Sequence, residues 1–359
     1  EVVTLRGSFS FNDGEEGTDL LDLKGFPKHL DEQDPGKLTG GVEPVFRRGD
    51  EPPLHPVLDK VGLQPRHVGH LGQRDAAGGK DAFYKGEIAD KMVAQVAKDG
   101  GILTHADLEG FTVRVLEPVR ATYRGYELIS SPPPSSGGTH VAQILNVLEN
   151  FDVASMEVNS VEYLHLFSEV FKICYADRAT YMGDPNFVKV PLEGLLSKEY
   201  AKELAARVDL TASQKPQAGD PWKHESMSTT HFSIADKDGN LVAVTRTINH
   251  FFGSCVVPEG TGFLLNDEME DFSIDPTSAN AVCGGKIPLS CMSPTFLLKD
   301  GKPFAVLGSP GGIRIISSVV QVISRMIDHG LSLEEAIALP RIGDDQTDLM
   351  IYEDRIPPE

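Results

Sequence analysis

The sequence lacks most features that mark membrane, metal-binding or disulfide-rich proteins. It contains no run of about 18 apolar residues, so no segment is expected to span a bilayer. Only four cysteines occur among 359 residues, and none belongs to a C-x-x-C pair or lies beside histidines at metal-ligand spacing. Their positions predict neither a zinc site nor a disulfide framework. These cysteines are Cys174, Cys255, Cys283 and Cys291.

Positive charge is also scarce. Lysine and arginine together number 33 against 53 aspartates and glutamates, which gives a net charge of −20 and a pI near 4.9. Such an acidic chain is a poor match for nucleic acid or an anionic membrane surface. The segment that begins at Glu1 has no basic and apolar leader pattern, so we expect no signal peptide within this sequence.

Two short patterns superficially suggest metal binding. His67-x-x-His70 is the only closely spaced pair of histidines in the sequence, but no acidic or cysteine residue lies near it. The string 236–239 resembles the start of a calcium loop, yet the ligand at the twelfth position and the flanking helices are missing. We therefore expect no metal site.

Secondary-structure signals become clear only after residue 80, because residues 1–80 show little sustained period. Forty per cent hydrophobic residues are enough for a substantial core. Apolar residues at helical spacing predict several helices, each with start or stop signals. These helices cover 86–99, a segment opening after 132–138, 161–180 with Asn159 or Ser160 as cap, a segment that follows 308–312 and ends at the terminator Gly330, and a last short helix with a Ser332–Glu335 capping box. In the helix 161–180, one apolar stripe is expected to face the core; it contains Leu164, Phe167, Phe171 and Cys174.

The region between these helices carries strand signals instead. Two alternating runs flank Asp238-Gly239, and two more flank Asp300-Gly301, a strong short-range sign of a hairpin. Helices before and after a block of hairpins predict an α+β fold in which helices cover a sandwich of sheets. A polar, proline-containing linker, 211–228, precedes the first hairpin and can be cut without disturbing a core.

The first hairpin has a geometric consequence for Thr229. A three-residue loop with Gly239 in the left-handed conformation would pair Asp236 with Asn240 and therefore place Thr229 opposite Thr247. A two-residue turn would place Ile248 there instead. We prefer the first register, because Thr247 would then lie on the same face as Thr229 and could orient it by a hydrogen bond.

Thr229 stands where the polar linker changes abruptly into a strand. If the Ser228–Thr229 bond is cut, Thr229 gains an α-amine beside its own hydroxyl. An α-amine has an ordinary pKa of about 8, so part of it is an unprotonated base at neutral pH. This amine can accept the hydroxyl proton and activate the oxygen as a nucleophile. The simpler interpretation is that Thr229-Thr230 merely opens a strand, since β-branched residues favour strands.

Seven strings between residues 80 and 342 decide between these interpretations. In this order they resemble the γ-glutamyltranspeptidase family of the N-terminal nucleophile hydrolase superfamily. Each string is weak alone, but seven in family order are specific. They are Pro132-Pro133-Pro134-Ser135-Ser136-Gly137-Gly138, Tyr175-Ala176-Asp177-Arg178, Thr229-Thr230-His231-Phe232, Thr247-Ile248-Asn249, the run 264–272, the run 288–295, and Gly308-Ser309-Pro310-Gly311-Gly312.

The resemblance implies a precursor that cleaves itself before Thr229. A large-subunit part, 1–228, and a small-subunit part, 229–359, would stay together in one four-layer αββα sandwich. Thr229 Oγ would attack first the Ser228 carbonyl and, after maturation, the γ-carbonyl of a glutamyl substrate. Thr247 matches the threonine that hydrogen-bonds the nucleophile.

The resemblance also implies an oxyanion hole. The backbone N–H groups of Gly311 and Gly312 match it, and glycines at a helix start let bare amides approach a negative oxygen. Without the resemblance, these glycines would be read as a plain strand-to-helix turn.

Five further positions match the family's substrate-binding residues. Asn249, Glu268 and Asp271 match groups that hold the α-amino group of the glutamyl moiety, although the two carboxylates alone would indicate a solvated acidic loop. Ser290 and Cys291 match the hydroxyl pair that holds the α-carboxylate.

Three departures from the family pattern affect this pocket. The Cys291 thiol is a weak donor where many members have a second serine. Residues 1–80 contain no counterpart of the family's carboxylate-binding arginine. The stretch 272–287 is shorter than in members with a lid loop, which predicts a more open site.

The activity that the resemblance implies is transfer of a γ-glutamyl group from glutathione-like donors to water, an amino acid or a peptide. No cofactor is required, since nucleophile, base and oxyanion donors all come from the chain. Family habit implies an extracytoplasmic location. Two alternatives stay open: a related acylase or poly-γ-glutamate hydrolase with an altered acyl pocket, and a processing-defective homologue that acts as a binding or structural protein.

Overall fold

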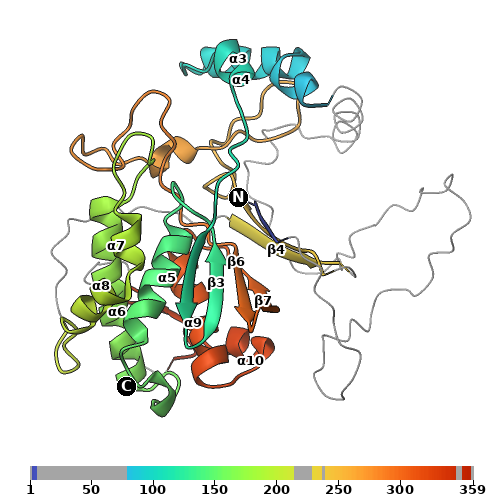
Figure 1. The fold of residues 1–359 in the computed structure, drawn as a ribbon. Helices are drawn as coiled ribbons and strands as arrows, with labels where there is room; N and C mark the ends of the chain where they lie inside the picture. The colour runs from blue at the N-terminus through green and yellow to red at the C-terminus, as the bar shows by residue number, and fades with distance from the viewer. Residues whose placement is uncertain (1, 6–78, 214–228, 237–238, 345–349, 357–359) are drawn as a thin grey trace, which may run out of the picture.

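The computed structural model describes residues 2–5, 79–213, 229–236, 239–344 and 350–356. His67, His70, Ser228 and most of the linker 211–228 lie outside these ranges. Within them, two antiparallel sheets dominate (Figure 1). The larger sheet has the order β2 (Val119–Tyr123), β3 (Tyr126–Ser130), β6 (Thr295–Lys299) and β7 (Lys302–Leu307). The smaller sheet has the order β1 (Val2–Leu5), β5 (Leu241–Thr247) and β4 (Thr229–Ala235).

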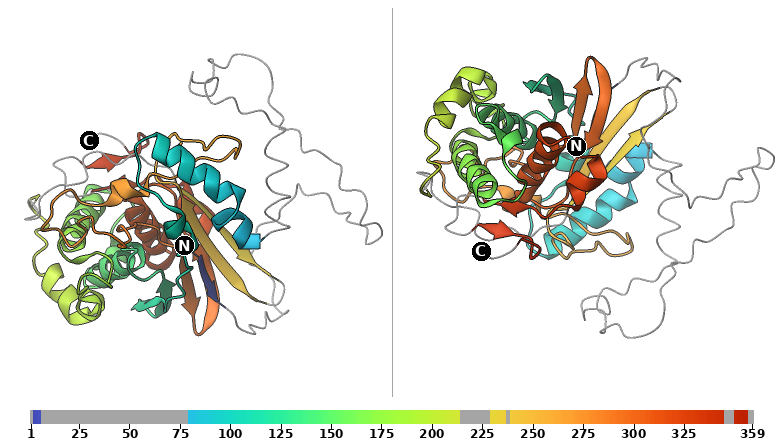
Figure 2. Two further views of the ribbon diagram at one scale, coloured as in Figure 1. Left: turned by 90° about the horizontal axis from the view of Figure 1, so that it is seen from above. Right: turned by 90° about the horizontal axis from the view of Figure 1, so that it is seen from below.

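The helices pack mainly on one side of the larger sheet, as the right view of Figure 2 shows. Its other face packs against the smaller sheet. Short β8 (Ile342–Gly343) and β9 (Ile351–Tyr352) form a separate pair. The helical segments are α3 (Glu87–Lys98), α4 (His105–Glu109), α5 (Gly137–Leu148), the 3-10 turn η1 (Val153–Ser155), α6 (Val161–Tyr181), α7 (Leu192–Leu196), α8 (Lys198–Ala205), the 3-10 turn η2 (Glu268–Asp271), α9 (Arg314–Asp328) and α10 (Leu333–Ala338).

Alternation along the strands explains the layering. In β3, Leu128 contributes to the core shared with α5, α6 and α9, whereas Ile129 faces the smaller sheet. There Ile129 belongs to the same apolar cluster as Leu241 and Ala243 of β5. Successive strand side chains point to opposite faces, so one strand serves two cores.

The predicted helices are confirmed, with one correction of detail. Ser160 caps α6 by accepting a hydrogen bond from the Tyr163 amide, and Ser332 forms the capping box expected for α10. Helix α6 was expected to bury one apolar stripe. It is instead buried on nearly all sides, including the polar residues Lys172 and Arg178, because several elements surround it.

The predicted register of the first hairpin is confirmed. Thr229 pairs with Thr247, and Ala235 pairs with Leu241. The Asp236 amide donates to the Asn240 carbonyl at 3.0 Å, and Gly239 has the left-handed φ of +80° that the three-residue loop requires.

The outer face of the smaller sheet carries exposed apolar side chains. Phe232 and Ile234 of β4 are 45% and 51% exposed, although they lie in the strand that begins with Thr229. The described residues therefore build a helix layer and two sheets. The second helical layer of the expected αββα sandwich stays a prediction. Across the described ranges, no helix is long and apolar enough to cross a membrane.

Candidate functional site

Thr229 is the first residue of β4 and lies directly opposite Thr247 at the end of β5. Both residues are half-buried. The Thr247 hydroxyl oxygen accepts a hydrogen bond from the Asn249 amide at 2.8 Å. Asn249 adopts φ of +69°, a conformation that is uncommon outside glycine and that asparagine tolerates better than most residues. One strand end thus brings Thr229, Thr247 and Asn249 together.

His231 lies on the same face of β4 as Thr229, and sequence reasoning gave it no role. Its Nδ1 lies 2.7 Å from Thr245 Oγ1 and its Nε2 lies 3.1 Å from Ser233 Oγ. Burial lowers the pKa of His231, which favours the neutral ring. A Cβ atom on Gly308 would come within 2.3 Å of the ring nitrogen Nδ1, so only glycine fits there. The strand that carries Thr229 therefore contacts the start of the glycine loop 308–312.

Gly311 and Gly312 connect β7 to α9 in backbone conformations that favour glycine, with φ of +134° and +54°. Their carbonyl groups accept hydrogen bonds from the Arg314 and Ile315 amides at 3.1 and 3.0 Å. Neither glycine N–H group has an acceptor among the described residues. Two amides at a helix start are therefore available to a negatively charged oxygen.

The acidic loop, which we define as residues 266–271, contains Glu268 and Asp271. Both carboxyl groups are half-buried, and Oε1 of Glu268 is fully covered. Burial raises the pKa of Glu268, although its hydrogen bond with Asp271 acts in the opposite direction. Burial and the neighbouring Glu268 charge raise the pKa of Asp271 to about 7, with Arg178 opposing the rise. The solvated acidic loop that the sequence suggested as an alternative does not fit this pair.

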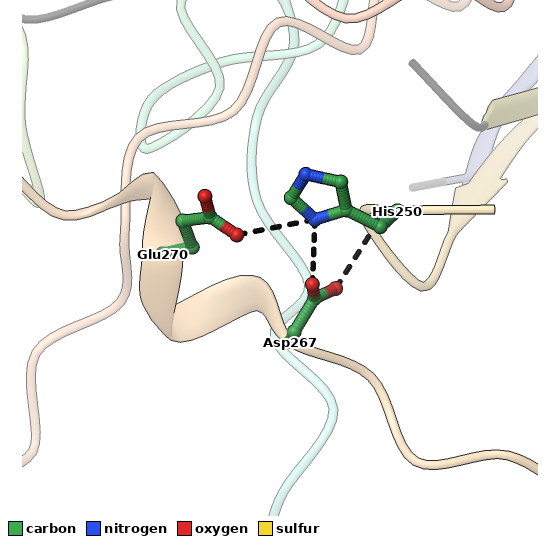
Figure 3. A group of neighbouring side chains, drawn as sticks. All are labelled: His250, Asp267 and Glu270. Carbon is green, nitrogen blue, oxygen red and sulfur yellow. Dashed lines mark hydrogen bonds and ion pairs between the residues drawn. The ribbon is translucent and has the colours of Figure 1, made fainter. Parts of the chain in front are cut away.

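His250 contacts two further carboxylates of the acidic loop, those of Asp267 and Glu270 (Figure 3). His250 Nδ1 lies 2.5 Å from Asp267 Oδ2 and 3.1 Å from Glu270 Oε2. One potential ligand atom from each residue lies within 4.8 Å of the others. Because Nδ1 is already at hydrogen-bonding distance from both carboxylates, the arrangement fits a hydrogen-bonded group better than a metal shell. Sequence analysis missed it, since a loop separates His250 from Asp267.

The serine-rich wall, which we define as residues 130–138 and 290–295, is closely packed. Ser135 Oγ donates to the Met292 carbonyl and Ser136 Oγ donates to the Ser290 carbonyl, both at 2.7 Å. A Cβ atom on Gly137 would lie 2.2 Å from Ser293 Oγ. These contacts give a structural reason for the serines and glycines of the two strings.

Arg178 links the serine-rich wall to the acidic loop. Its side chain is almost fully buried. Nε donates to Ser136 Oγ and one terminal nitrogen donates to Cys291 Sγ, both at 2.8 Å. The same guanidinium acts against the rise in the pKa of Asp271. The string 175–178 was recognised in the sequence, but only the tertiary structure gives Arg178 this place.

The structure thus links several of the expected positions through short contacts. Ser290 Oγ accepts a hydrogen bond from the Met292 amide at 3.1 Å, and the Cys291 side chain is buried against Arg178. Thr229, Thr247 and Asn249 lie at the strand end, the pair Glu268 and Asp271 beside them, and the wall with Ser290 and Cys291 beyond Arg178. Ser228, the other half of the expected cleavage site, lies outside the described residues.

Comparison with known proteins shows the family to which the chain belongs. The Gamma-glutamyltranspeptidase family model matches residues 66–359, and the chain belongs to this family. It is 46% identical over 279 residues to a glutathione hydrolase proenzyme from Pseudomonas sp. strain A14, covering 74% of this chain and 48% of that protein. It is 42% identical over 267 residues to Acylase ACY 1 proenzyme from Pseudomonas sp. strain SE83, again covering 74% and 48%.

A solved structure is similar as well. The crystal structure of cephalosporin acylase from Bacillus halodurans aligns with a TM-score of 0.74 and 30% identity, covering 82% of this chain and 53% of that one. The chain spans about half the length of the curated relatives that it matches.

Proposed function

We propose that this chain carries the catalytic site of a self-processing γ-glutamyl transferase and hydrolase. The observation that carries the proposal is the pairing of Thr229 with Thr247. It sets a mid-chain threonine at a strand start, directly opposite a second hydroxyl residue. Family membership supports the same conclusion, since several relatives are glutathione hydrolase proenzymes.

Self-cleavage of the precursor uses the Thr229 hydroxyl at the start of β4. Thr229 Oγ attacks the Ser228 carbonyl carbon, and the peptide nitrogen leaves as the Thr229 amine, which takes the hydroxyl proton. Water then hydrolyses the resulting ester and frees the carboxylate of Ser228. The products are a fragment 1–228 and a fragment 229–359 that stay associated, because β6 of the second pairs with β3 of the first and β5 packs against the same strand.

Acyl transfer reuses the same groups. The free α-amine of Thr229 accepts the proton of its own hydroxyl while Oγ attacks the γ-carbonyl of a glutamyl donor. The Gly311 and Gly312 amides stabilise the oxyanion, and the leaving amine departs with a proton from the Thr229 ammonium. Water or an acceptor amine then attacks the glutamyl ester and regenerates Thr229.

The donor's α-ammonium is held by the ammonium cradle, which we define as Asn249, Glu268 and Asp271. A cation placed between the two carboxylates offsets their mutual repulsion and lowers the pKa of both. Ser290, Cys291 and the buried Arg178 then face the donor's α-carboxylate side. Binding of the donor's ammonium therefore stabilises the ionised forms of Glu268 and Asp271.

A second candidate is an acylase that accepts a related acyl group. The similarity to cephalosporin acylase and the thiol at Cys291 both favour it. The chemistry at Thr229 is the same, and only the acyl pocket differs. Turnover of a glutaryl amide in preference to a γ-glutamyl amide would support this candidate.

Intact mass and N-terminal sequencing of the purified chain test the proposal. We expect two fragments, one beginning Thr-Thr-His-Phe, and hydrolysis of a γ-glutamyl anilide. Thr229→Ala should remain a single chain without activity. An uncleaved wild-type chain that no γ-glutamyl probe acylates would rule out the enzyme and favour a binding or structural homologue. Fractionation of the producing cells tests the extracytoplasmic location that we infer from the family.

A further inference from the structure

We propose that His250 and Asp267 are positioning residues that fix the geometry of the ammonium cradle. The inference rests on the proposed function, because it assigns these residues to the binding of a donor's α-ammonium. Neither residue belongs to the cradle itself. Together with Glu270 they form the group drawn in Figure 3.

The cradle comes from two separate segments. Asn249 follows β5, whereas Glu268 and Asp271 belong to the acidic loop. Residues 251–265 separate the two segments, so local chain geometry does not fix their spacing. Contacts between the segments must do so.

Asp267 supplies these contacts to three consecutive residues. Its amide donates to the Ile248 carbonyl at 3.3 Å, and its Oδ1 accepts from the His250 amide at 3.1 Å. Its own carbonyl oxygen lies 3.5 Å from Nδ2 of Asn249. Asp267 therefore holds Asn249 and both of its neighbours, and the next residue in the chain is Glu268.

The His250 side chain adds a further contact between the segment that follows β5 and the acidic loop. Nδ1 points between the carboxylates of Asp267 and Glu270, as Figure 3 shows. Hydrogen bonds to a carboxylate are stronger than neutral ones. The His250 and Asp267 side chains are only 24% and 21% exposed, whereas Glu270 is 54% exposed. Solvent therefore weakens the Glu270 contact most, and the His250–Asp267 pair dominates.

The pair also secures an unfavourable backbone conformation. Asn249 has φ of +69°, which costs free energy for a residue other than glycine unless its surroundings hold it. The hydrogen bonds of Asp267 to Ile248 and His250 do so on both sides. Without the bond from the His250 amide to Asp267 Oδ1, Asn249 is less restrained and shifts relative to Glu268.

Calorimetric titration with L-glutamate and with glutarate tests this assignment, because glutarate lacks the α-amino group. In the full chain we expect His250→Ala and Asp267→Ala each to raise the Kd of L-glutamate about tenfold, the typical effect of losing a hydrogen bond to a charged group. The Kd of glutarate should stay unchanged. The double variant should cost less than the sum of the two single variants, because both remove the contact between His250 Nδ1 and Asp267 Oδ2.

Two matched variants sharpen the test. His250→Asn keeps an N–H donor near the position of Nδ1 and should recover most of the affinity. Ser254→Ala removes a hydrogen bond from Ser254 Oγ to the Leu265 carbonyl (3.1 Å) in the same loop, away from the cradle, and should bind L-glutamate as the wild type does.

The outcomes separate the inference from the proposed function. Unchanged L-glutamate affinity in both alanine variants, or equal losses for L-glutamate and glutarate, would overturn the positioning role. Failure of the wild-type chain to cleave itself would overturn the proposed function, while the two dissociation constants would still report on the cradle.

Discussion

The two sides of the candidate site are built in opposite ways. The serine-rich wall is closely packed, and several of its hydroxyl groups bond to carbonyl oxygens of the facing segment. The acidic loop is half-exposed, carries carboxyl groups with raised pKa values, and depends on few contacts. We expect substitutions in the closely packed wall to lower the stability of the fold. We expect the charged loop to respond mainly to changes in pH. Arg178 donates hydrogen bonds to the wall, and its charge lowers the pKa of Asp271 in the acidic loop.

The largest expected effect is on the serine-rich wall. Gly137→Ala places a Cβ atom 2.2 Å from Ser293 Oγ and 2.3 Å from the Met292 carbonyl oxygen. Overpacking against backbone should lower the free energy of unfolding by about 3 kcal/mol, as measured by denaturant titration. Gly194→Ala in α7 meets nothing within 4 Å and should be neutral or slightly stabilising. Equal stability of the two variants would contradict the close packing.

The second-largest expected effect is on catalysis and concerns the backbone conformation of Gly311 in the glycine loop 308–312. Gly311→Ala creates no close contact, but its φ of +134° is poorly accessible to alanine. We expect the amide to turn away and kcat for a γ-glutamyl anilide to fall about 100-fold, as for loss of one oxyanion donor. Gly284→Ala, in open space, should leave kcat unchanged. Retained kcat in Gly311→Ala would remove this amide from the oxyanion hole.

The acidic loop should respond to pH with the opposite sign from an ordinary salt-bridged carboxylate. The pKa of Asp271 is raised from 3.8 to about 7, mainly by burial and then by Glu268. The native state therefore binds the extra proton between these values, and stability falls as the pH rises through this window. Asp271→Asn should reduce the dependence of stability on pH. At pH 8 it should stabilise the protein by about 1 to 2 kcal/mol, after discounting for partial exposure.

Thermal unfolding between pH 4 and pH 8 measures this difference, and Asp275→Asn is its control. The exposed Asp275 carboxylate accepts hydrogen bonds from the Thr277 amide and hydroxyl, which lower its pKa. Its replacement should give no gain at pH 8. A similar gain in both variants would mean that general charge reduction, and not burial of Asp271, is responsible.

The smallest expected effect compares two buried thiols. Cys291→Ser introduces a hydroxyl that can accept from Arg178, so stability should change by less than about 0.5 kcal/mol. Cys174→Ser places a hydroxyl in the apolar helix–sheet core and should cost about 1 kcal/mol or more. Denaturant midpoints check the order of the two, and the reverse order would contradict the polar setting of Cys291.

Local sequence signals predicted five helices and two hairpins, because the causes of these elements are local. The Ser332–Glu335 capping box and the left-handed Gly239 each act within a few residues, so helix starts and hairpin register followed from them. The same signals misjudged α6, where Lys172 and Arg178 are buried. Burial depends on neighbours distant in the chain, and a periodic pattern carries no information about them.

The sequence by itself determined the first hairpin and limited the partner of Thr229 to Thr247 or Ile248, because strand alternation and the turn length fix a hairpin register. It also determined the family, through strings in a fixed order. Only the tertiary structure decided the contact of Arg178 with Cys291, the close approach of Gly308 to the His231 ring, and the hydrogen bond of His250 with Asp267. Such contacts join segments far apart in the chain, and their geometry arises from packing, which no local pattern encodes.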